Sequence, residues 1–123
     1  MTARLLLALG SILMALAVAL GAFSAHAAKG AAHPEAARLL QTAVLYQLVH
    51  GLAVVLAGAL ARTGGSAWLV LAAGLHVAGI ALFCGSLWYL AFTARSLGAV
   101  APLGGLAFIA GWLALAVFAL RSG

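Results

Sequence analysis

The side chains best suited to chemistry lie within one long apolar segment of the chain. Thr42, Tyr46 and His50 follow one another at intervals of four residues, and Gln47 comes three residues before His50. On a helix, residues at this spacing share one face. Polar groups at membrane depth are costly, so each of them marks a candidate site. The spacing therefore predicts a polar stripe that faces the protein interior, where it either lines a binding site or bonds neighbouring helices and fixes their register.

Polar groups in other segments are expected to lie at the same depth as this stripe. If the apolar segments run alternately up and down, the end of the first and the end of the third reach the half of the membrane that holds Thr42. This arrangement predicts a polar cavity that opens to one side of the membrane. The candidate cluster comprises His26, Thr42, Tyr46, Gln47, His50, Ser86 and Tyr89.

A second histidine falls at a similar depth to His50. His76 lies about as far beyond Arg62 as His50 lies before it, so the two are level in an antiparallel hairpin. Two facing imidazoles are able to ligate haem iron, as in bundle cytochromes. Equally, they fit two neutral, hydrogen-bonded histidines of the core. The spacing does not decide whether the rings face each other, and no further ligand pattern indicates a metal.

The remaining reactive groups do not form a catalytic set. Glu35 is the only acid, so no pair of carboxylates is available, and no spacing indicates a Ser-His-Asp or Cys-His arrangement. The single cysteine, Cys84, has no partner for an intrachain disulfide. We therefore predict a protein that is not an enzyme and that needs no cofactor.

The elements that must position these residues are membrane helices. The chain has 123 residues, of which 67% are hydrophobic and only 6% charged, with a mean hydropathy of +1.27. Soluble domains carry about 25% charged residues, so the soluble class is excluded. Four apolar stretches reach the roughly 20 residues that a spanning helix needs. They run from about 5–25, 39–61, 67–92 and 100–120.

These stretches predict an all-α protein, a four-transmembrane-helix bundle of up-down topology with both termini on the same side. Short connections leave residues 1–123 as a single membrane domain. Small residues spaced four apart predict close helix packing. These pairs are Ala17 with Gly21, Ala81 with Gly85, and Ala107 with Gly111.

The charges mark the ends of these segments. The formal net charge of +5 comes from basic residues scattered singly, which does not fit a nucleic-acid surface. They are Arg4, Lys29, Arg38, Arg62, Arg95 and Arg121. Three lie on each side of the membrane, so the positive-inside rule does not orient the chain. The first segment resembles a signal peptide with an A-x-A site at Ala25–Ala27, yet its length favours a retained helix. Its signal-like character favours a cytoplasmic N-terminus.

Ordered motifs along the chain resemble a known family. They are Gly21-Ala22-Phe23 with Ala25-His26; Thr42-Ala43-Val44 with Tyr46, Gln47 and His50; Gly85-Ser86-Leu87 with Tyr89; and Pro102 with Gly104-Gly105, Phe108 and Gly111-Trp112. In these motifs the chain is similar to the small bacterial membrane proteins grouped as domain of unknown function 423, which have a mitochondrial relative in eukaryotes. The resemblance implies a four-helix bacterial inner-membrane protein and a retained first helix. It implies no catalytic residues.

The expected function follows from the compact apolar bundle with almost no mass outside the membrane. The leading hypothesis is a non-enzymatic inner-membrane protein that packs in lipid against copies of itself or a larger membrane complex. The alternative is a small transport or ligand-binding unit that uses the polar cavity. A haem-binding bundle is the second alternative.

Overall fold

A computed structural model describes residues 1–27 and 35–122, and these residues form an all-helical fold. The helices are α1 (Thr2–Ala27), α2 (Ala36–Ala61), α3 (Ala67–Gly79), a π-helical turn η2 (Ile80–Cys84), α4 (Gly85–Thr93) and α5 (Val100–Arg121). The elements α3, η2 and α4 follow one another without a break, so they form one continuous rod. No strand occurs in the described residues.

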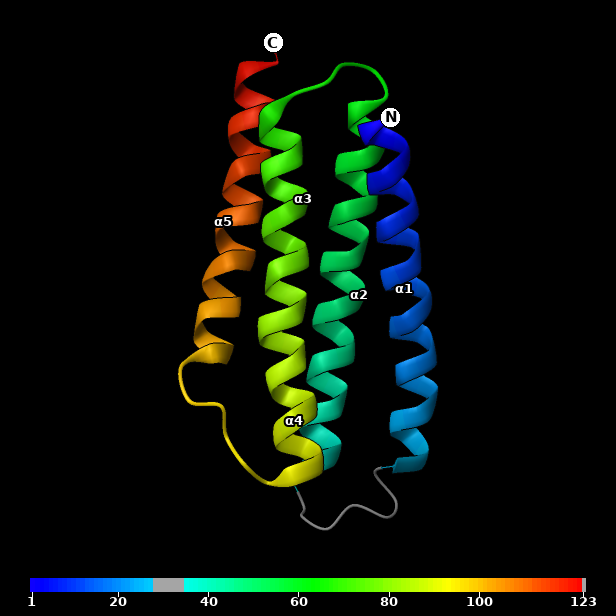
Figure 1. Ribbon diagram of the computed structural model, residues 1–123, viewed down its shortest axis with the longest axis vertical. Coiled ribbons are helices and arrows are strands. Elements are labelled where there is room, and N and C mark those ends of the chain that lie inside the picture. Colours follow the sequence, from blue (N-terminus) through cyan, green and yellow to red (C-terminus); the bar gives the residue numbers. More distant parts are fainter. Residues whose placement is uncertain (28–34, 123) are drawn as a thin grey trace.

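The predicted fold class is confirmed. Among the described residues, four helical spans are long and apolar enough to cross a membrane: Thr2–His26, Ala36–Ala61, Ala67–Thr93 and Val100–Arg121. Their bounds lie within a few residues of the predicted ones. The spans run up and down, and both termini lie at the end that also holds the connection between α2 and α3 (Figure 1).

The helices pack as a series rather than as a ring in which every helix has two full neighbours. α1 packs along α2, and α5 packs along α3 and η2, while α2 and the rod of α3, η2 and α4 form the central pair. Neither α1 nor α5 packs extensively against any other element, as the side-by-side arrangement in Figure 1 indicates. One face between α2 and α5 is therefore left uncovered by a helix.

Glycines set how closely these helices approach. A Cβ atom on Gly10 of α1 would lie 2.7 Å from the backbone nitrogen of Val55, and one on Gly58 of α2 would lie 2.8 Å from the backbone nitrogen of Leu7. On the other side, a Cβ on Gly104 of α5 would collide with the backbone of Phe83. Small residues at such points let membrane helices pack backbone to backbone. The close packing expected from the small residues is therefore present, although the tightest contacts are at glycines outside the predicted pairs.

The π-helical turn is a feature that the sequence analysis did not predict. It widens the third span at Ile80–Cys84 and shifts the phase of the residues that follow. Its Cys84 is buried, and the Sγ atom donates a hydrogen bond to the carbonyl oxygen of Ala43 on α2 at 3.3 Å. The turn thereby joins the two central helices at the level of Phe83.

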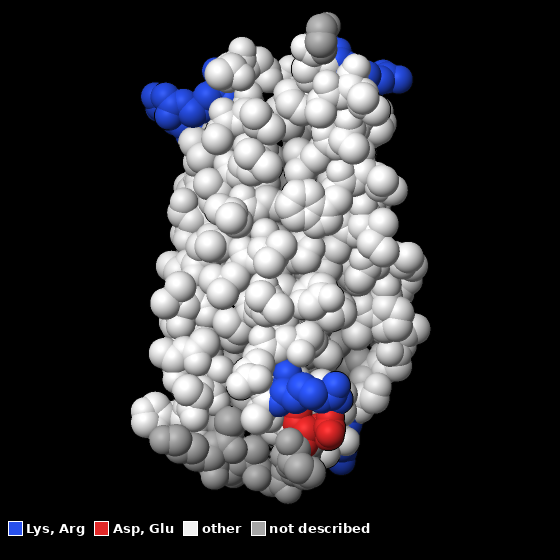
Figure 2. Space-filling model, turned by 180° about the vertical axis from the view of Figure 1, so that it is seen from behind, with Lys and Arg blue, Asp and Glu red and all other residues white. Residues whose placement is uncertain are grey.

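Charged side chains lie at the two ends of the molecule. On the face shown in Figure 2, the long apolar body between the ends carries no lysine, arginine or acid. Arg4, Arg62 and Arg121 belong to the end that holds both termini, and Arg38 and Arg95 to the opposite end. At that opposite end the Arg38 guanidinium forms an ion pair with Glu35. Lys29 lies outside the described residues.

Candidate functional site

The uncovered face between α2 and α5 holds a groove of about 520 Å³. Its walls come from α2 and α5, and Phe83 of the π-helical turn contributes to the lining. The lining residues are Tyr46, His50, Phe83, Pro102, Gly105, Leu106, Phe108, Ile109 and Trp112. The groove is open because several residues along its rim, including Leu106 and Ile109, are exposed. The polar side-chain atoms of its lining come from Tyr46, His50 and Trp112. We call this groove the head groove.

His50 is held at the head groove by its own helix and by α5. Its ring nitrogen Nδ1 lies 2.7 Å from the carbonyl oxygen of Tyr46, one turn earlier on α2. Since a carbonyl oxygen only accepts, Nδ1 is the donor and carries the hydrogen. The ring stacks on Phe108, with 3.5 Å between ring centroids and 15° between planes. Two neighbours therefore fix both the tautomer and the plane of this imidazole.

Tyr46 is the second polar group of the head groove. Its ring centroid lies 4.5 Å from that of Phe83 and 5.7 Å from that of His50. The side chain is 38% exposed, and its hydroxyl bonds to no other described residue. A phenol hydroxyl both donates and accepts, so it is available to a ligand in the groove.

His76 meets His50, which the spacing alone did not establish. The two ring centroids lie 5.3 Å apart. His76 is fully buried, and neither of its ring nitrogens has a hydrogen-bond partner among the described residues. The ring fits against α5 because position 111 is glycine, where a Cβ would stand 2.8 Å from Nε2. A buried polar group without a partner is costly, which makes this imidazole exceptional within an apolar core.

The histidine pair is surrounded by aromatic rings, which bears on the haem hypothesis. Phe108 covers one face of His50, and Trp112 lies edge to face with His76 at 4.9 Å between centroids. A porphyrin between the two imidazoles would need the space that these rings fill, so the site does not fit haem. Among the described residues, no three His, Cys, Asp or Glu side chains gather as a metal site would require.

Three other predicted site residues bond to backbone carbonyls. The Thr42 hydroxyl donates to the carbonyl oxygen of Arg38 at 2.9 Å, and the Ser86 hydroxyl donates to that of Leu82. Gln47 reaches further, because its Nε2 donates to the carbonyl oxygen of Leu13 on α1 at 3.1 Å. Gln47 therefore joins two helices, whereas Thr42 and Ser86 each bond within their own span.

His26 and Tyr89 lie apart from the head groove. Both are exposed, and neither lines it. The structure therefore brings together Tyr46 and His50 of the predicted cluster with His76 next to His50, and leaves the other members outside the groove on α1, α2 and α4. The lining of the groove is mostly aromatic and aliphatic, whereas the sequence analysis expected a polar cavity.

Phe83, Gly105 and Trp112 line the head groove but were not predicted from the sequence to belong to the site. Trp112 is 41% exposed and lines the groove. A pattern signal did exist, since Phe108 and Trp112 are four residues apart on one face of a helix. It was not decisive, because such aromatic pairs are common in helix cores.

A second groove lies along α2 and is next to the head groove at Trp112. It has a volume of about 500 Å³, and Trp112 lines both grooves. Its lining is entirely apolar: Val49, Leu52, Ala53, Val55, Leu56, Ala59 and Trp112. We call it the tail groove. The two grooves share the Trp112 side chain, and we refer to the pair as the channel, in which polar side chains line only the head groove.

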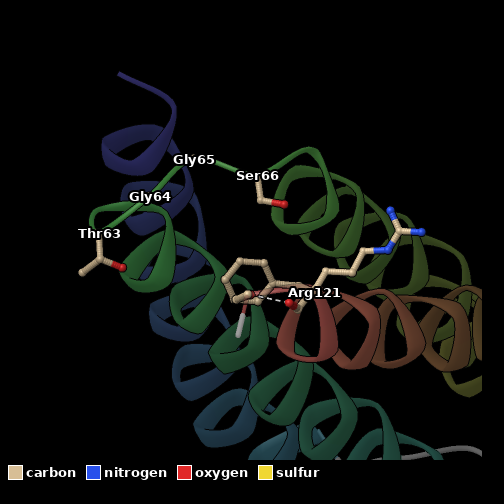
Figure 3. A pocket seen from close by; sticks show the side chains of 7 residues that line it. Thr63, Gly64, Gly65, Ser66 and Arg121 are labelled. Atoms are coloured by element: carbon tan, nitrogen blue, oxygen red, sulfur yellow. Dashed lines mark hydrogen bonds between the residues drawn. The ribbon is translucent and has the colours of Figure 1, made fainter.

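A separate pocket lies at the end of the molecule that holds the termini. Figure 3 shows Thr63, Gly64, Gly65 and Ser66 on the connection between α2 and α3, with Arg121 of α5 nearby. The Arg121 guanidinium lies 5.6 Å from the ring centroid of Trp68, a cation–π contact. Arginine and tryptophan at the end of a span are typical of the level of lipid headgroups. The composition of this pocket is therefore typical of the level of a membrane surface.

The fold and the helix compositions define a multi-pass membrane protein with four spanning helices. A family model described as a protein of unknown function, DUF423, matches residues 20–105. That range covers more than half of the chain, and the chain belongs to this family. The resemblance that the sequence motifs indicated is thereby confirmed.

Relatives from several bacteria support the same assignment. The UPF0382 membrane protein YwdK of Bacillus subtilis is 39% identical over 120 residues, which cover 96% of this chain and 98% of YwdK. The UPF0382 inner membrane protein YgdD of Escherichia coli is 38% identical over 123 residues, covering 98% and 93%. A UPF0382 membrane protein of Staphylococcus haemolyticus is 39% identical over 115 residues, covering 93% of each chain. No solved structure matches this chain significantly.

Proposed function

We propose that this protein binds a membrane-soluble amphiphile in the channel formed by the head and tail grooves. The observation that carries the proposal is the pairing of His50 and an unbonded Tyr46 hydroxyl with an otherwise aromatic and aliphatic lining. Ligand sites of a few hundred cubic ångströms are typically apolar, with a few polar groups that orient the ligand. The channel has this composition, and its polar end is next to a purely apolar one.

A pair of glycine variants tests this proposal. Gly105 lines the head groove, and a Cβ added there meets nothing within 4 Å, so Gly105→Leu fills the groove without a backbone clash. Gly74 is the matched control, since it is exposed on α3, has the same open space and does not line the groove. Lipid extracts of the purified protein, analysed by mass spectrometry, should contain an enriched amphiphile that Gly105→Leu loses and Gly74→Leu keeps. Equal extracts from both variants would contradict the proposal.

Packing against another membrane protein is the second candidate function, and a different face supports it. On the outward side of the third span, four small residues follow at intervals of four, three and four: Gly74, Ala78, Ala81 and Gly85. All four are exposed, and a Cβ added at either glycine would meet no other atom within 4 Å. Such a flat strip suits the close approach of another membrane helix. The predicted pair Ala81 and Gly85 belongs to this strip, whereas Ala17 and Gly111 are buried within the protein.

The same two variants separate the two functions. If the protein acts as an accessory subunit or forms a homo-oligomer through α3, Gly74→Leu should dissociate the assembly and Gly105→Leu should leave it intact. Chemical crosslinking in native membranes, followed by purification in mild detergent, measures this. A protein that stays monomeric in both experiments would contradict the packing function and leave the ligand-binding function in place.

We further propose that the protein is a non-enzymatic component of the bacterial inner membrane with a cytoplasmic N-terminus. The name of the Escherichia coli relative places that relative in the inner membrane, and the first span resembles a signal segment because the basic Arg4 is followed by an apolar run. Reporter fusions at the two termini test the orientation. Both should be active only as cytoplasmic reporters, and activity of a periplasmic reporter at either terminus would reverse the assignment.

A further inference from the structure

This inference rests on the proposed ligand-binding function and concerns the chemistry of the ligand. The hydrogen-bonding groups of the head groove restrict which ligands are able to satisfy them. The His50 Nδ1 atom donates to the Tyr46 carbonyl oxygen at 2.7 Å. In a neutral imidazole, one nitrogen donates and the other accepts, so Nε2 is left as an acceptor. No bond from Nε2 to another described residue is present. A ligand that satisfies this nitrogen must therefore bring a hydrogen-bond donor.

The Tyr46 hydroxyl further restricts which hydrogen-bonding groups the ligand carries. The Tyr46 hydroxyl has no partner among the described residues, and it is able to donate or to accept. A ligand hydroxyl is able to bond to both His50 and Tyr46, because it carries one donor and two acceptor positions. A ligand carbonyl is able to bond only to Tyr46 and leaves the His50 nitrogen unpaired. The pair of groups therefore distinguishes a hydroxyl from a carbonyl on otherwise similar ligands.

The walls of the channel indicate the rest of the ligand. Phe83, Phe108 and Trp112 line the head groove together with the two polar rings. Aromatic groups prefer offset or edge-to-face contact with other rings, and each such pair adds to the energy of simple burial. The tail groove adjoins these rings at Trp112 and contains no polar lining atom, which suits an alkyl or isoprenoid chain.

We propose that the ligand is a hydroxylated aromatic ring on a long apolar tail, the class of the isoprenoid hydroquinones. The ring lies in the head groove with one hydroxyl donating to His50 Nε2, and the tail extends along the tail groove. The corresponding quinone has carbonyl oxygens in place of the hydroxyls, so it loses the bond to His50 and binds more weakly. The proposal concerns binding alone and includes no electron transfer.

The test compares a decyl-substituted benzohydroquinone with its quinone on the full-length protein in nanodiscs. The hydroquinone is kept reduced under anaerobic conditions, and empty nanodiscs correct for partition into lipid. One hydrogen bond of ordinary strength corresponds to a preference of about tenfold for the hydroquinone. His50→Phe keeps an aromatic ring next to Phe108 but removes the acceptor, so this preference should fall to about one.

Tyrosine variants supply a second measurement with a matched control. Tyr46 and Tyr89 are exposed to nearly the same extent, 38% and 39%, but only Tyr46 lines the groove. Tyr46→Phe should weaken both forms of the probe by about fivefold, whereas Tyr89→Phe should change neither. These two conservative substitutions test the ligand site without relying on the His50→Phe variant. Thermal melting of each variant identifies any that fails to fold.

The possible outcomes distinguish a failure of the proposed ligand class from a failure of the proposed ligand-binding function. Equal binding of hydroquinone and quinone, both abolished by Gly105→Leu, would overturn the ligand class and retain a ligand-binding groove. Dioleoylglycerol, which has an aliphatic hydroxyl, should bind weakly; binding as tight as that of the hydroquinone would overturn the aromatic ring. Binding of every probe at the level of the Gly105→Leu variant would overturn the proposed function as well.

Discussion

The two long sides of α2 meet the rest of the molecule in opposite ways. Towards α1, α2 presents Gly51 and Gly58, and α1 presents Gly10, so the backbones approach until a single methyl group would clash. Towards α5, the same helix presents Tyr46 and His50, and no helix closes that side. Both sides are mostly apolar and each carries polar side chains, Gln47 towards α1 and Tyr46 and His50 towards α5, so hydropathy does not distinguish the two sides.

The difference shows that the placement of glycines, more than hydrophobicity, decides where two helices of this protein pack closely and where a groove remains between them. Apolar side chains gain little by leaving lipid for another apolar surface, so close packing drives helix association in a membrane. Glycines provide this packing along α1. On the side of α5, the rings of His50 and Phe108 lie between the two helices, and a groove remains beside them. We call these two sides the closed seam and the open groove.

The largest expected effect comes from filling the closed seam. In Gly10→Val, the Cβ would lie 2.7 Å from the backbone nitrogen of Val55, which cannot move without displacing α2. Overpacking of this kind should lower the free energy of unfolding by about 3 kcal/mol, measured by unfolding in mixed detergent micelles. Gly74→Val, where a Cβ meets nothing within 4 Å, is the control. Equal effects of the two variants would mean that the seam is not closed by glycine.

The second prediction concerns the contact between Gly111 of α5 and the buried His76 ring, which lies next to the open groove. Gly111→Ala places a Cβ 2.8 Å from Nε2 of the fully buried His76 ring, and we expect a cost of about 2 kcal/mol. In a His76→Ala background the same change should cost less than about 0.5 kcal/mol, because the ring is gone. A double-mutant cycle measures this coupling. Additive effects would show that Gly111 does not accommodate His76.

A smaller effect is expected from the polar bond across the closed seam. Gln47→Leu removes the bond from Nε2 to the Leu13 carbonyl oxygen, and bonds of this kind in membranes contribute about 0.6 kcal/mol on average. Gln41→Leu on the exposed side of the same helix is the control and should be neutral. Thermal melting of the two variants in one detergent provides the comparison. If Gln41→Leu lowered the melting temperature as much as Gln47→Leu, the bond from Gln47 to Leu13 would not account for the effect.

The smallest effect is expected where a hydroxyl bonds within its own helix. Thr42→Val should change the free energy of unfolding by less than about 0.5 kcal/mol, because the bond from Thr42 to the Arg38 carbonyl joins no second element. Ligand content should also stay unchanged, since Thr42 does not line the head groove. A loss of ligand in Thr42→Val would mean that the binding site extends beyond that groove.

Much of the fold was predictable because the membrane imposes a simple requirement on every span. Each span must satisfy its own backbone hydrogen bonds and must be long enough to cross the hydrocarbon, and both properties are local in sequence. The spans, the up-down order and the common side of the termini were therefore predicted correctly. The π-helical turn at Ile80–Cys84 was not predicted, because an extra residue in a helix leaves hydropathy unchanged.

The candidate site was predictable only in part, for the same physical reason. Tyr46 and His50 were found because polar residues in an apolar run stand out and because their spacing defines a face. Whether His50 faces His76 depends on how α2 and α3 are rotated about their axes, and Phe108 and Gly111 of α5 contribute to the packing around both rings. Those contacts join residues far apart in the chain, which spacing does not report.

The amino-acid sequence by itself determined that this is a membrane protein of four helices, where each helix ends, and to which family it belongs. Only the tertiary structure decided that α1 closes against α2 while α5 leaves a groove, and that Tyr46, His50 and His76 gather beside it with aromatic rings. The reason is that hydrophobicity acts on each helix separately, whereas the meeting of rings and glycines depends on the relative rotation of pairs of helices.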